Sequence, residues 1–201
     1  MIFLTQITPF KGRLGDLIHM DINEKALLFR AQSGDRQAAG LLYESNYQDV
    51  YTYIFYRIKD STAAEELSTE VFVKMLHSLP SFIDEGKPFI SWLYTIARNL
   101  VNEYYLNQEI WDLLPDKDQP PEEDQILPEY QFHDQEALAC FRRALDHLDE
   151  QQKDLIIHRL VEGRSVQDIA DLTNKSERAV RSLQHRAIQS LEKALQKENC
   201  L

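Results

Sequence analysis

Apolar side chains recur every three or four positions along residues 64–79, and this spacing predicts an amphipathic helix. Pro80 is expected to end that helix, because proline lacks a backbone donor and restricts the residue before it. Pro88 suits the first turn of a second helix. The expected buried stripes consist of Leu67, Val71, Phe72, Met75, Leu76 and Leu79 in the first helix, and of Phe89, Trp92, Leu93, Ile96, Ala97 and Leu100 in the second. The pattern therefore predicts two packed helices joined by a short loop.

Two further helices are expected before this pair. Asn23 can cap a helix that ends near Ser33, because Gly34 and Asp35 then break the pattern. The next helix is expected over about residues 36–59, and Asp60 then starts the helix of residues 64–79. Together these segments predict one small helical domain.

Two segments of the chain lack a helical pattern. Residues 1–19 show no clear periodicity, which leaves two alternatives open: translation begins at Met20, or these residues form a mobile N-terminal extension. Residues 107–133 contain eight acids, one lysine and four prolines. Such a composition cannot bury enough apolar surface to fold alone, so it predicts an extended acidic linker between two domains.

Helical periodicity returns from residue 134 to the end of the chain. Ser165 and Asp168 have the spacing of a capping box at the start of a short helix. Asn174 suits the tight turn that follows, because asparagine tolerates left-handed backbone, and Ser176 can cap the longer helix after it. Two helices around a three-residue turn form a helix-turn-helix. The predicted fold class is therefore all-α: two small helical domains joined by an acidic, proline-rich linker, the C-terminal one a helix-turn-helix.

The second helix of such a motif enters the DNA major groove with its early residues toward the bases. Val180, Ala187 and Leu191 are expected to face the scaffold, with either Leu183 or Gln184 beside them. Arginine suits the paired acceptors on guanine, so the outward face is a candidate DNA contact. That face consists of Arg178, Arg181, Ser182, His185 and Arg186.

The charge of the whole chain limits how it can bind DNA. The 201 residues carry a formal net charge of -11. Phosphate neutralisation supplies most nonspecific affinity for duplex DNA, so unaided binding is disfavoured. Residues 175–193 nevertheless hold five basic and two acidic residues, which places the cations in the predicted helix-turn-helix. A DNA reader with this balance needs a partner that supplies basic surface.

Other classes of function find little support. The chain has no glycine-rich phosphate loop and no cluster with metal-ligand spacing, so neither an enzyme, a cofactor nor a metal is expected. It has no run of about 18 apolar residues and no secretion signal, so no membrane insertion is expected. Cys140 and Cys200 are expected to be unpaired thiols, because two cysteines so far apart make no disulfide framework.

Several motifs in order resemble one family. AEELSTEVFVKML, LPSFIDEGKPF and WLYTIARNL, within about residues 21–105, resemble region 2 of bacterial RNA polymerase sigma factors of the extracytoplasmic-function (ECF) group. SVQDIADLTNKSERAVRSLQHRA is similar to region 4 of the same family. Asn174 stands where glycine is common, and the order Leu183-Gln184 departs from the usual one, so the phase of the last helix stays open. The resemblance implies a region 2 domain over 20–106 and a region 4 domain over 134–201.

The resemblance also implies three binding surfaces. A pocket for a flipped base of the minus-ten element is expected from Ser78, Phe82, Ile96 and Asn99. The surface for core polymerase is expected from Glu65, Glu66, Thr69, Glu70 and Lys74. Contacts to the minus-thirty-five element are expected from Lys175, Arg178, Arg181, Ser182, His185 and Arg186.

The implied function is that of a cytoplasmic sigma factor. Its expected partners are core RNA polymerase, promoter DNA and an anti-sigma factor, and it directs promoter recognition, DNA melting and initiation without being an enzyme. The alternative is a stand-alone helix-turn-helix regulator that binds operator DNA without polymerase.

Overall fold

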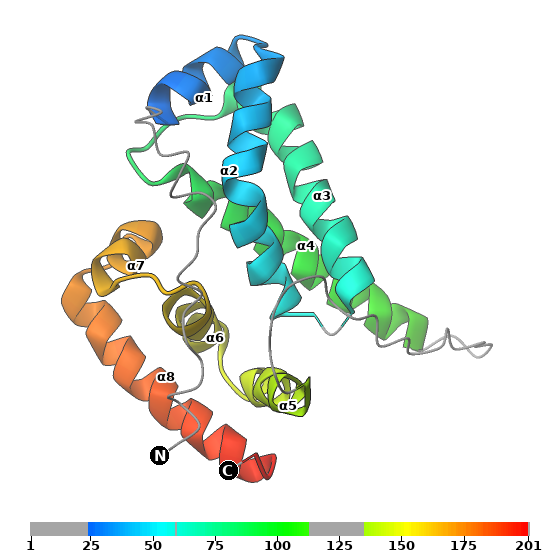
Figure 1. Ribbon diagram of the computed structural model, residues 1–201, viewed down its shortest axis with the longest axis vertical. Helices are drawn as coiled ribbons and strands as arrows, with labels where there is room; N and C mark the ends of the chain where they lie inside the picture. Colours follow the sequence, from blue (N-terminus) through cyan, green and yellow to red (C-terminus); the bar gives the residue numbers. More distant parts are fainter. Residues whose placement is uncertain (1–23, 59, 113–134, 201) are drawn as a thin grey trace.

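The computed structural model describes residues 24–58, 60–112 and 135–200, and all their regular elements are helical. The N-terminal domain contains α1 (Glu24–Gln32), α2 (Arg36–Phe55), α3 (Ser61–Ser78), the 3-10 turn η3 (Leu79–Ser81) and α4 (Phe89–Asp112). The C-terminal domain contains α5 (Gln135–Asp146), α6 (Glu150–Ile156), the π-helical segment η4 (Ile157–Val161), α7 (Val166–Thr173) and α8 (Glu177–Lys197). Figure 1 shows the two groups of helices side by side. The predicted all-α fold with two helical domains is confirmed.

The starts of α2 and α3 follow from aspartate caps. Oδ1 of Asp35 accepts hydrogen bonds from the backbone N–H of Gln37 and Ala38, at 2.9 and 3.2 Å. Asp60 caps α3 in the same way, at 2.8 and 3.1 Å. These bonds satisfy donors that a helix leaves unpaired in its first turn. The proposed cap Asn23 and the segment 1–19 lie outside the described residues.

Two expected features of the N-terminal domain were wrong. Leu76 was expected in the buried stripe of α3, but half of it is exposed (51%). It follows Met75 directly in the chain and so lies about 100° further round the helix than the buried stripe of Val71 and Met75. Helix α4 runs to Asp112, past residue 107 where the linker was expected to begin, and residues 113–133 lie outside the described part. Proline first appears at 115, so the sequence before it can stay helical.

The helix-turn-helix is confirmed by its local geometry. Ser165 and Asp168 form the predicted capping box, with side chain to backbone distances of 2.9 and 3.0 Å. Asn174 has φ 54°, the left-handed conformation that asparagine tolerates. Ser176 caps α8 through the N–H of Ala179. Leu183 is buried with Val180, Ala187 and Leu191, which settles the phase of α8.

The two cysteines form a disulfide, which corrects the expectation of unpaired thiols. Cys140 in α5 and Cys200 after α8 have Cα atoms 6.1 Å apart. The C-terminus reaches α5 through a Schellman turn, in which Asn199 adopts φ 55°. The N–H of Asn199 donates to the Gln196 carbonyl at 3.2 Å, and that of Cys200 to the Leu195 carbonyl at 2.9 Å. Sequence spacing gives no sign of this reversal of the chain.

Reduction of this disulfide is expected to lower the melting temperature. A bridge of this kind typically stabilises a domain by about 2–4 kcal/mol, by restricting the unfolded chain. For a domain of fewer than 100 residues, this corresponds to a shift of roughly 10 °C or more. Circular dichroism melts with and without dithiothreitol measure the shift. Cys140→Ser is the control and should not respond to the reductant, whereas an unresponsive wild type would contradict the prediction.

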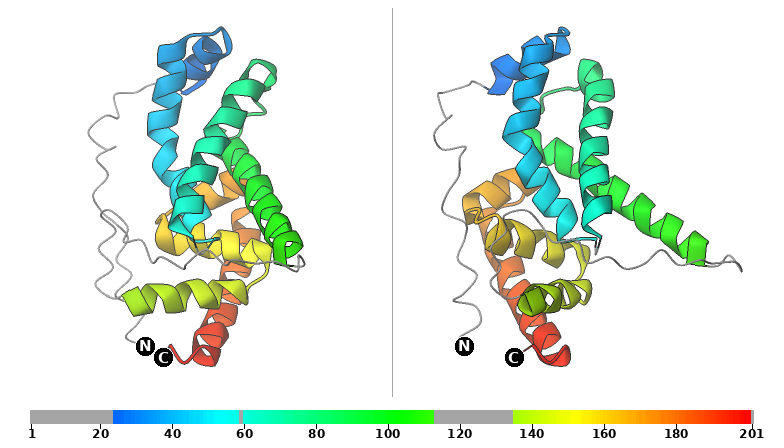
Figure 2. Two further views of the ribbon diagram at one scale, coloured as in Figure 1. Left: turned by 90° about the vertical axis from the view of Figure 1, so that its right-hand side faces the viewer. Right: turned by 45° about the vertical axis from the view of Figure 1, so that its right-hand side comes forward.

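The domains pack against each other as well as within themselves. The C-terminal half of α2 and the middle of α4 face α5, α6 and η4, as the views of Figure 2 show. Buried side chains of the two domains form one continuous cluster. In the described part of the chain, no helix has the length and apolar character needed to cross a membrane.

Candidate nucleic-acid interface

A pocket of about 280 Å³ opens between the end of α3 and the first half of α4. Three of the four residues predicted for the minus-ten element, Ser78, Ile96 and Asn99, line it. Sequence reasoning missed two other lining residues, His77 and Trp92, and assigned a third, Lys74, to the polymerase surface. The sequence does place these lining residues on shared helix faces. The spacing is four residues between Lys74 and Ser78 on one helix, and four and then three residues from Trp92 through Ile96 to Asn99 on the other.

Phe82 lies outside this pocket. Its ring packs at 4.5 Å from the ring of Trp92 and edge-on to Phe89 at 5.7 Å, measured between centroids. The side-chain amide of Gln32 in α1 donates to the carbonyl of Phe82 at 2.7 Å and so holds the loop against the domain. Phe82 therefore supports the wall of the pocket through Trp92, and Trp92 presents the aromatic surface.

The pocket combines an aromatic wall with polar groups. Trp92 offers a π-face on which a base can stack, and Asn99 is exposed and carries both a donor and an acceptor. Lys74 adds a cation that is shared with Glu70 at 3.2 Å and Glu103 at 3.8 Å. The volume of the pocket is slightly below that of drug-sized sites, which is about 300–1,000 Å³, so the pocket suits a single heterocycle.

The outer face of α3 presents four of the five residues predicted for core polymerase, whereas the fifth, Lys74, lines the pocket. Glu65, Glu66, Thr69 and Glu70 are all exposed. Two apolar side chains that sequence reasoning did not assign to this face, Val73 (47% exposed) and Leu76, lie on the same helix. Apolar residues among polar ones are the composition of a protein interface. We call these six residues the α3 face.

The early part of α8 presents the predicted minus-thirty-five contacts. Arg178, Arg181, Ser182, His185 and Arg186 are exposed, on the side of α8 opposite its buried stripe. The guanidinium of Arg181 pairs with Glu177 one turn earlier at 2.7 Å. Such an exposed pair is weak, so it leaves Arg181 able to exchange this partner for a base or phosphate.

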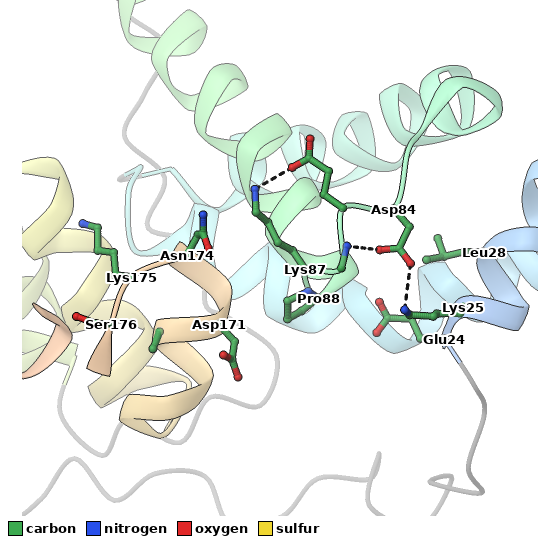
Figure 3. A pocket seen from close by; sticks show the side chains of 13 residues that line it. Glu24, Lys25, Leu28, Asp84, Lys87, Pro88, Asp171, Asn174, Lys175 and Ser176 are labelled. Atoms are coloured by element: carbon green, nitrogen blue, oxygen red, sulfur yellow. Dashed lines mark hydrogen bonds and ion pairs between the residues drawn. The ribbon is translucent and has the colours of Figure 1, made fainter. Parts of the chain in front are cut away.

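Lys175 lies apart from this row, in the turn before α8. Its ammonium donates to the side-chain carbonyl of Gln151 at 2.9 Å. It lines a groove of about 930 Å³ between the helix-turn-helix and the loop before α4, drawn in Figure 3. Two cations of the groove's other wall, Lys25 and Lys87, pair with the acids Asp84 and Glu85. The groove thus offers no concentrated charge for a ligand, and the described residues contain no cluster that could hold a metal.

Comparison with known proteins gives matches in both domains. The family Sigma-70 region 2 matches residues 42–109, and the family Sigma-70, region 4 matches residues 138–191. The first match contains the pocket and the α3 face, and the second contains the helix-turn-helix. The order of the two matches is the order of the two domains.

Individual relatives agree with these matches. The ECF RNA polymerase sigma factor BldN of Streptomyces coelicolor is 32% identical over 170 residues, which cover 84% of this chain and 64% of BldN. SigX of Bacillus subtilis, another ECF sigma factor, is 31% identical over 167 residues, which cover 78% of this chain and 82% of SigX.

A solved structure shares the fold. It is the sigma factor RpoE in complex with the anti-sigma factor NepR from Bartonella quintana, with a TM-score of 0.56, 22% identity, and coverage of 78% of this chain and 96% of that chain. With matching family regions in both domains and a relative at 31% identity covered over four fifths of its length, the chain belongs to the ECF group of RNA polymerase sigma factors.

Proposed function

We propose that this chain binds core RNA polymerase and directs it to begin transcription at a particular set of promoters. The observation that carries the proposal is that one chain combines a base-sized pocket with a basic helix-turn-helix. The helix-turn-helix is suited to duplex DNA, where α8 would read the minus-thirty-five element. The pocket is suited to an unstacked base, which duplex DNA does not offer.

The pocket gives the protein a means of holding promoter DNA open. Extruding a base from the stack costs a few kcal/mol, so a site that binds the extruded base favours the melted state. Stacking on an aromatic side chain returns about 1–3 kcal/mol for each base. Trp92 would supply that stacking, and Asn99 would supply hydrogen bonds to the edge of the base. We assign this base to the nontemplate strand of the minus-ten element.

The net negative charge of the chain favours core polymerase as its partner in DNA binding. A net charge of -11 opposes association with DNA, so the basic surface must come from the larger enzyme. The α3 face would dock on polymerase, with Val73 and Leu76 at its centre and the acids around them. The chain itself would act as an initiation factor in the cytoplasm and would perform no catalysis.

A third partner is proposed from the structural relatives. RpoE was solved with an anti-sigma factor bound. We propose that an anti-sigma protein also binds this chain and keeps it from polymerase until a signal arrives.

Run-off transcription with purified chain, bacterial core polymerase and a genomic promoter library tests the function. Defined start sites that depend on the added chain are expected, and their upstream sequences would give both promoter elements. Failure to co-purify with core polymerase, or co-purification without start-site preference, would contradict the proposal. A stand-alone regulator would instead shift operator DNA in the absence of polymerase.

A further inference from the structure

Helix α1 is bonded to the loop that joins α3 to α4, which consists of residues 79–88 and which we call the 79–88 loop. At the start of this loop, the side-chain amide of Gln32 donates hydrogen bonds to two backbone carbonyls, that of Leu79 at 3.1 Å and that of Phe82 at 2.7 Å. An amide nitrogen carries two N–H donors, so one side chain can serve both carbonyls. Gln32 therefore holds the turn η3 at both of its ends.

The opposite end of α1 contacts the opposite end of the loop. The carboxylate of Glu24 accepts a hydrogen bond from the backbone N–H of Phe89, the first residue of α4, at 2.8 Å. The first N–H groups of a helix have no partner within it and favour a negative charge, so Glu24 caps α4 from another helix. Between the two ends, Lys25 pairs with Asp84 at 3.5 Å, as Figure 3 shows, but this exposed pair adds little.

Few other contacts hold the 79–88 loop in place. Of residues 82–88, all of which the structure describes, only Phe82 is half-buried and the others are exposed. The hydrogen bond from the Gly86 N–H to Asp84, at 2.7 Å, lies within the loop and does not join it to a helix. An exposed loop with few buried contacts has low local stability. The position of Phe82 therefore depends on its ring contacts and on Gln32.

Phe82 connects this arrangement to the pocket between α3 and α4. Its ring packs on that of Trp92 at 4.5 Å, and the ring of Phe89 packs on Trp92 at 5.5 Å, both measured between centroids. Trp92 lines the pocket, whereas neither Gln32 nor Glu24 does. Helix α1 thus bonds to the backbone of two aromatic residues that support the indole of Trp92, and it does so from outside the space where a base would lie.

The apolar side of α1 fixes this helix in the N-terminal domain. Leu27, Leu28 and Ala31 are buried there. At about 1.5 Å per residue, the helix separates Glu24 from Gln32 by about 12 Å. The two hydrogen-bonding side chains therefore stand on a rigid support, which sets the separation between the two ends of the loop.

We propose that α1 positions the wall of the pocket: Gln32 and Glu24 hold the 79–88 loop so that Trp92 keeps the orientation in which an extruded base stacks on it. The inference rests on the proposed function of the pocket, and it adds two residues that act without touching the base. Both are positioning residues, because they reach Trp92 only through the backbone of Phe82 and Phe89. Loss of the Gln32 donors should impair capture of the base and leave binding to core polymerase unchanged.

The fluorescence of Trp92 tests this positioning without reference to DNA. The chain has two tryptophans, so the parent variant Trp111→Phe leaves Trp92 as the only one. In this parent, Gln32→Glu keeps the size of the side chain but replaces its N–H donors with carboxylate oxygens, which repel the two carbonyls. Phe82 should then leave the indole. We expect the emission of Trp92 to shift to longer wavelength and acrylamide to quench it more strongly.

Further variants separate the hydrogen bonds of Gln32 from its size and from the added charge. Gln32→Lys restores N–H donors of similar reach and should return the emission of Trp92 most of the way to that of the parent. Gln37→Glu makes the same change at an exposed glutamine of α2 that does not line the pocket, and its emission should match that of the parent.

Circular dichroism shows whether each variant keeps its helices. If Gln32→Glu unfolds, the uncharged truncation Gln32→Ala and the weakened cap Glu24→Gln decide, and each should shift the emission of Trp92 in the same direction. Emission that is the same in the parent and in every folded variant of Gln32 and Glu24 would overturn the proposal, as would equal emission from Gln32→Glu and Gln32→Lys.

Run-off transcription measures the consequence in the chain with both tryptophans. Gln32→Glu should lower the transcript from a fully duplex promoter by about fivefold, the factor that corresponds to one ordinary hydrogen bond, and by much less on a template melted in advance. It should co-purify with core polymerase as the wild type does.

Two outcomes separate this inference from the proposed function. A shifted emission of Trp92 with undiminished transcription from duplex promoters would overturn the role of α1 in base capture. A shifted emission with no transcription even from the wild type would support the positioning of Trp92 by Gln32 and contradict the proposed function.

Discussion

Asn99→Ala is expected to reduce run-off transcription from a fully duplex promoter by about tenfold or more. The alanine removes the amide that would bind the edge of the flipped base, and hydrogen bonds of this kind contribute about 1 kcal/mol each, more when the other partner is left unsatisfied. On a template melted in advance around the minus-ten element, the defect should largely disappear, because the cost of extruding the base has been removed.

Asn102→Ala is the control for this prediction. Asn102 is an exposed asparagine of the same helix and does not line the pocket, so its replacement changes helix propensity in the same way. Its transcription should match the wild type on both templates. An equal loss for Asn99→Ala on duplex and premelted templates would show that the pocket does not act in melting.

The double replacement Arg181→Ala/Arg186→Ala is expected to lower transcription by tenfold or more at promoters that depend on the minus-thirty-five element. A good bidentate contact between arginine and guanine discriminates by about 1–3 kcal/mol. Both side chains are exposed on the early part of α8, and neither contributes to its buried stripe, so the fold should be preserved.

A scrambled upstream element turns this into a test of specific contact. If these arginines read that element, scrambling it should lower transcription by the wild type but lower transcription by the double variant little further. The two changes would then remove the same interaction, so their effects would not add. Lys193→Ala removes an exposed cation from the later part of the same helix and should have little effect. Fully additive losses would show that the arginines do not read the upstream element.

The ends of the predicted helices agree with the structure where interactions between neighbouring residues determine them. Asp60 caps α3, the Ser165 and Asp168 pair forms a capping box, and Asn174 turns the chain between α7 and α8. These interactions join residues at most four positions apart, so the sequence displays both partners together. The same holds for the buried stripe of α8, where only the choice between Leu183 and Gln184 needed the structure.

The pocket was predicted in part. Ser78, Ile96 and Asn99 were found by resemblance to the family, and the structure brings them together. Trp92 was expected in the core, because an aromatic side chain at helical spacing normally is buried. It lies half-buried instead, since the loop carrying Phe82 covers one of its faces and leaves another open to the pocket.

The sequence by itself determines the helices of this protein, their capped ends and the helix-turn-helix, because each depends on neighbours within about one turn of helix. The disulfide and the contacts between the domains depend on residues far apart in the chain, 60 positions for the two cysteines and 101 for Tyr53 and Asp154. Periodicity shows which side of a helix is buried, but it does not show which element covers that side. Helix α2 shows the difference: its pattern marks one apolar side, yet Val50, Tyr51, Thr52, Tyr53, Ile54 and Phe55 are all buried. Only the packing of the second domain on its other side buries Tyr53 and places Arg57 against the carboxylates of α6.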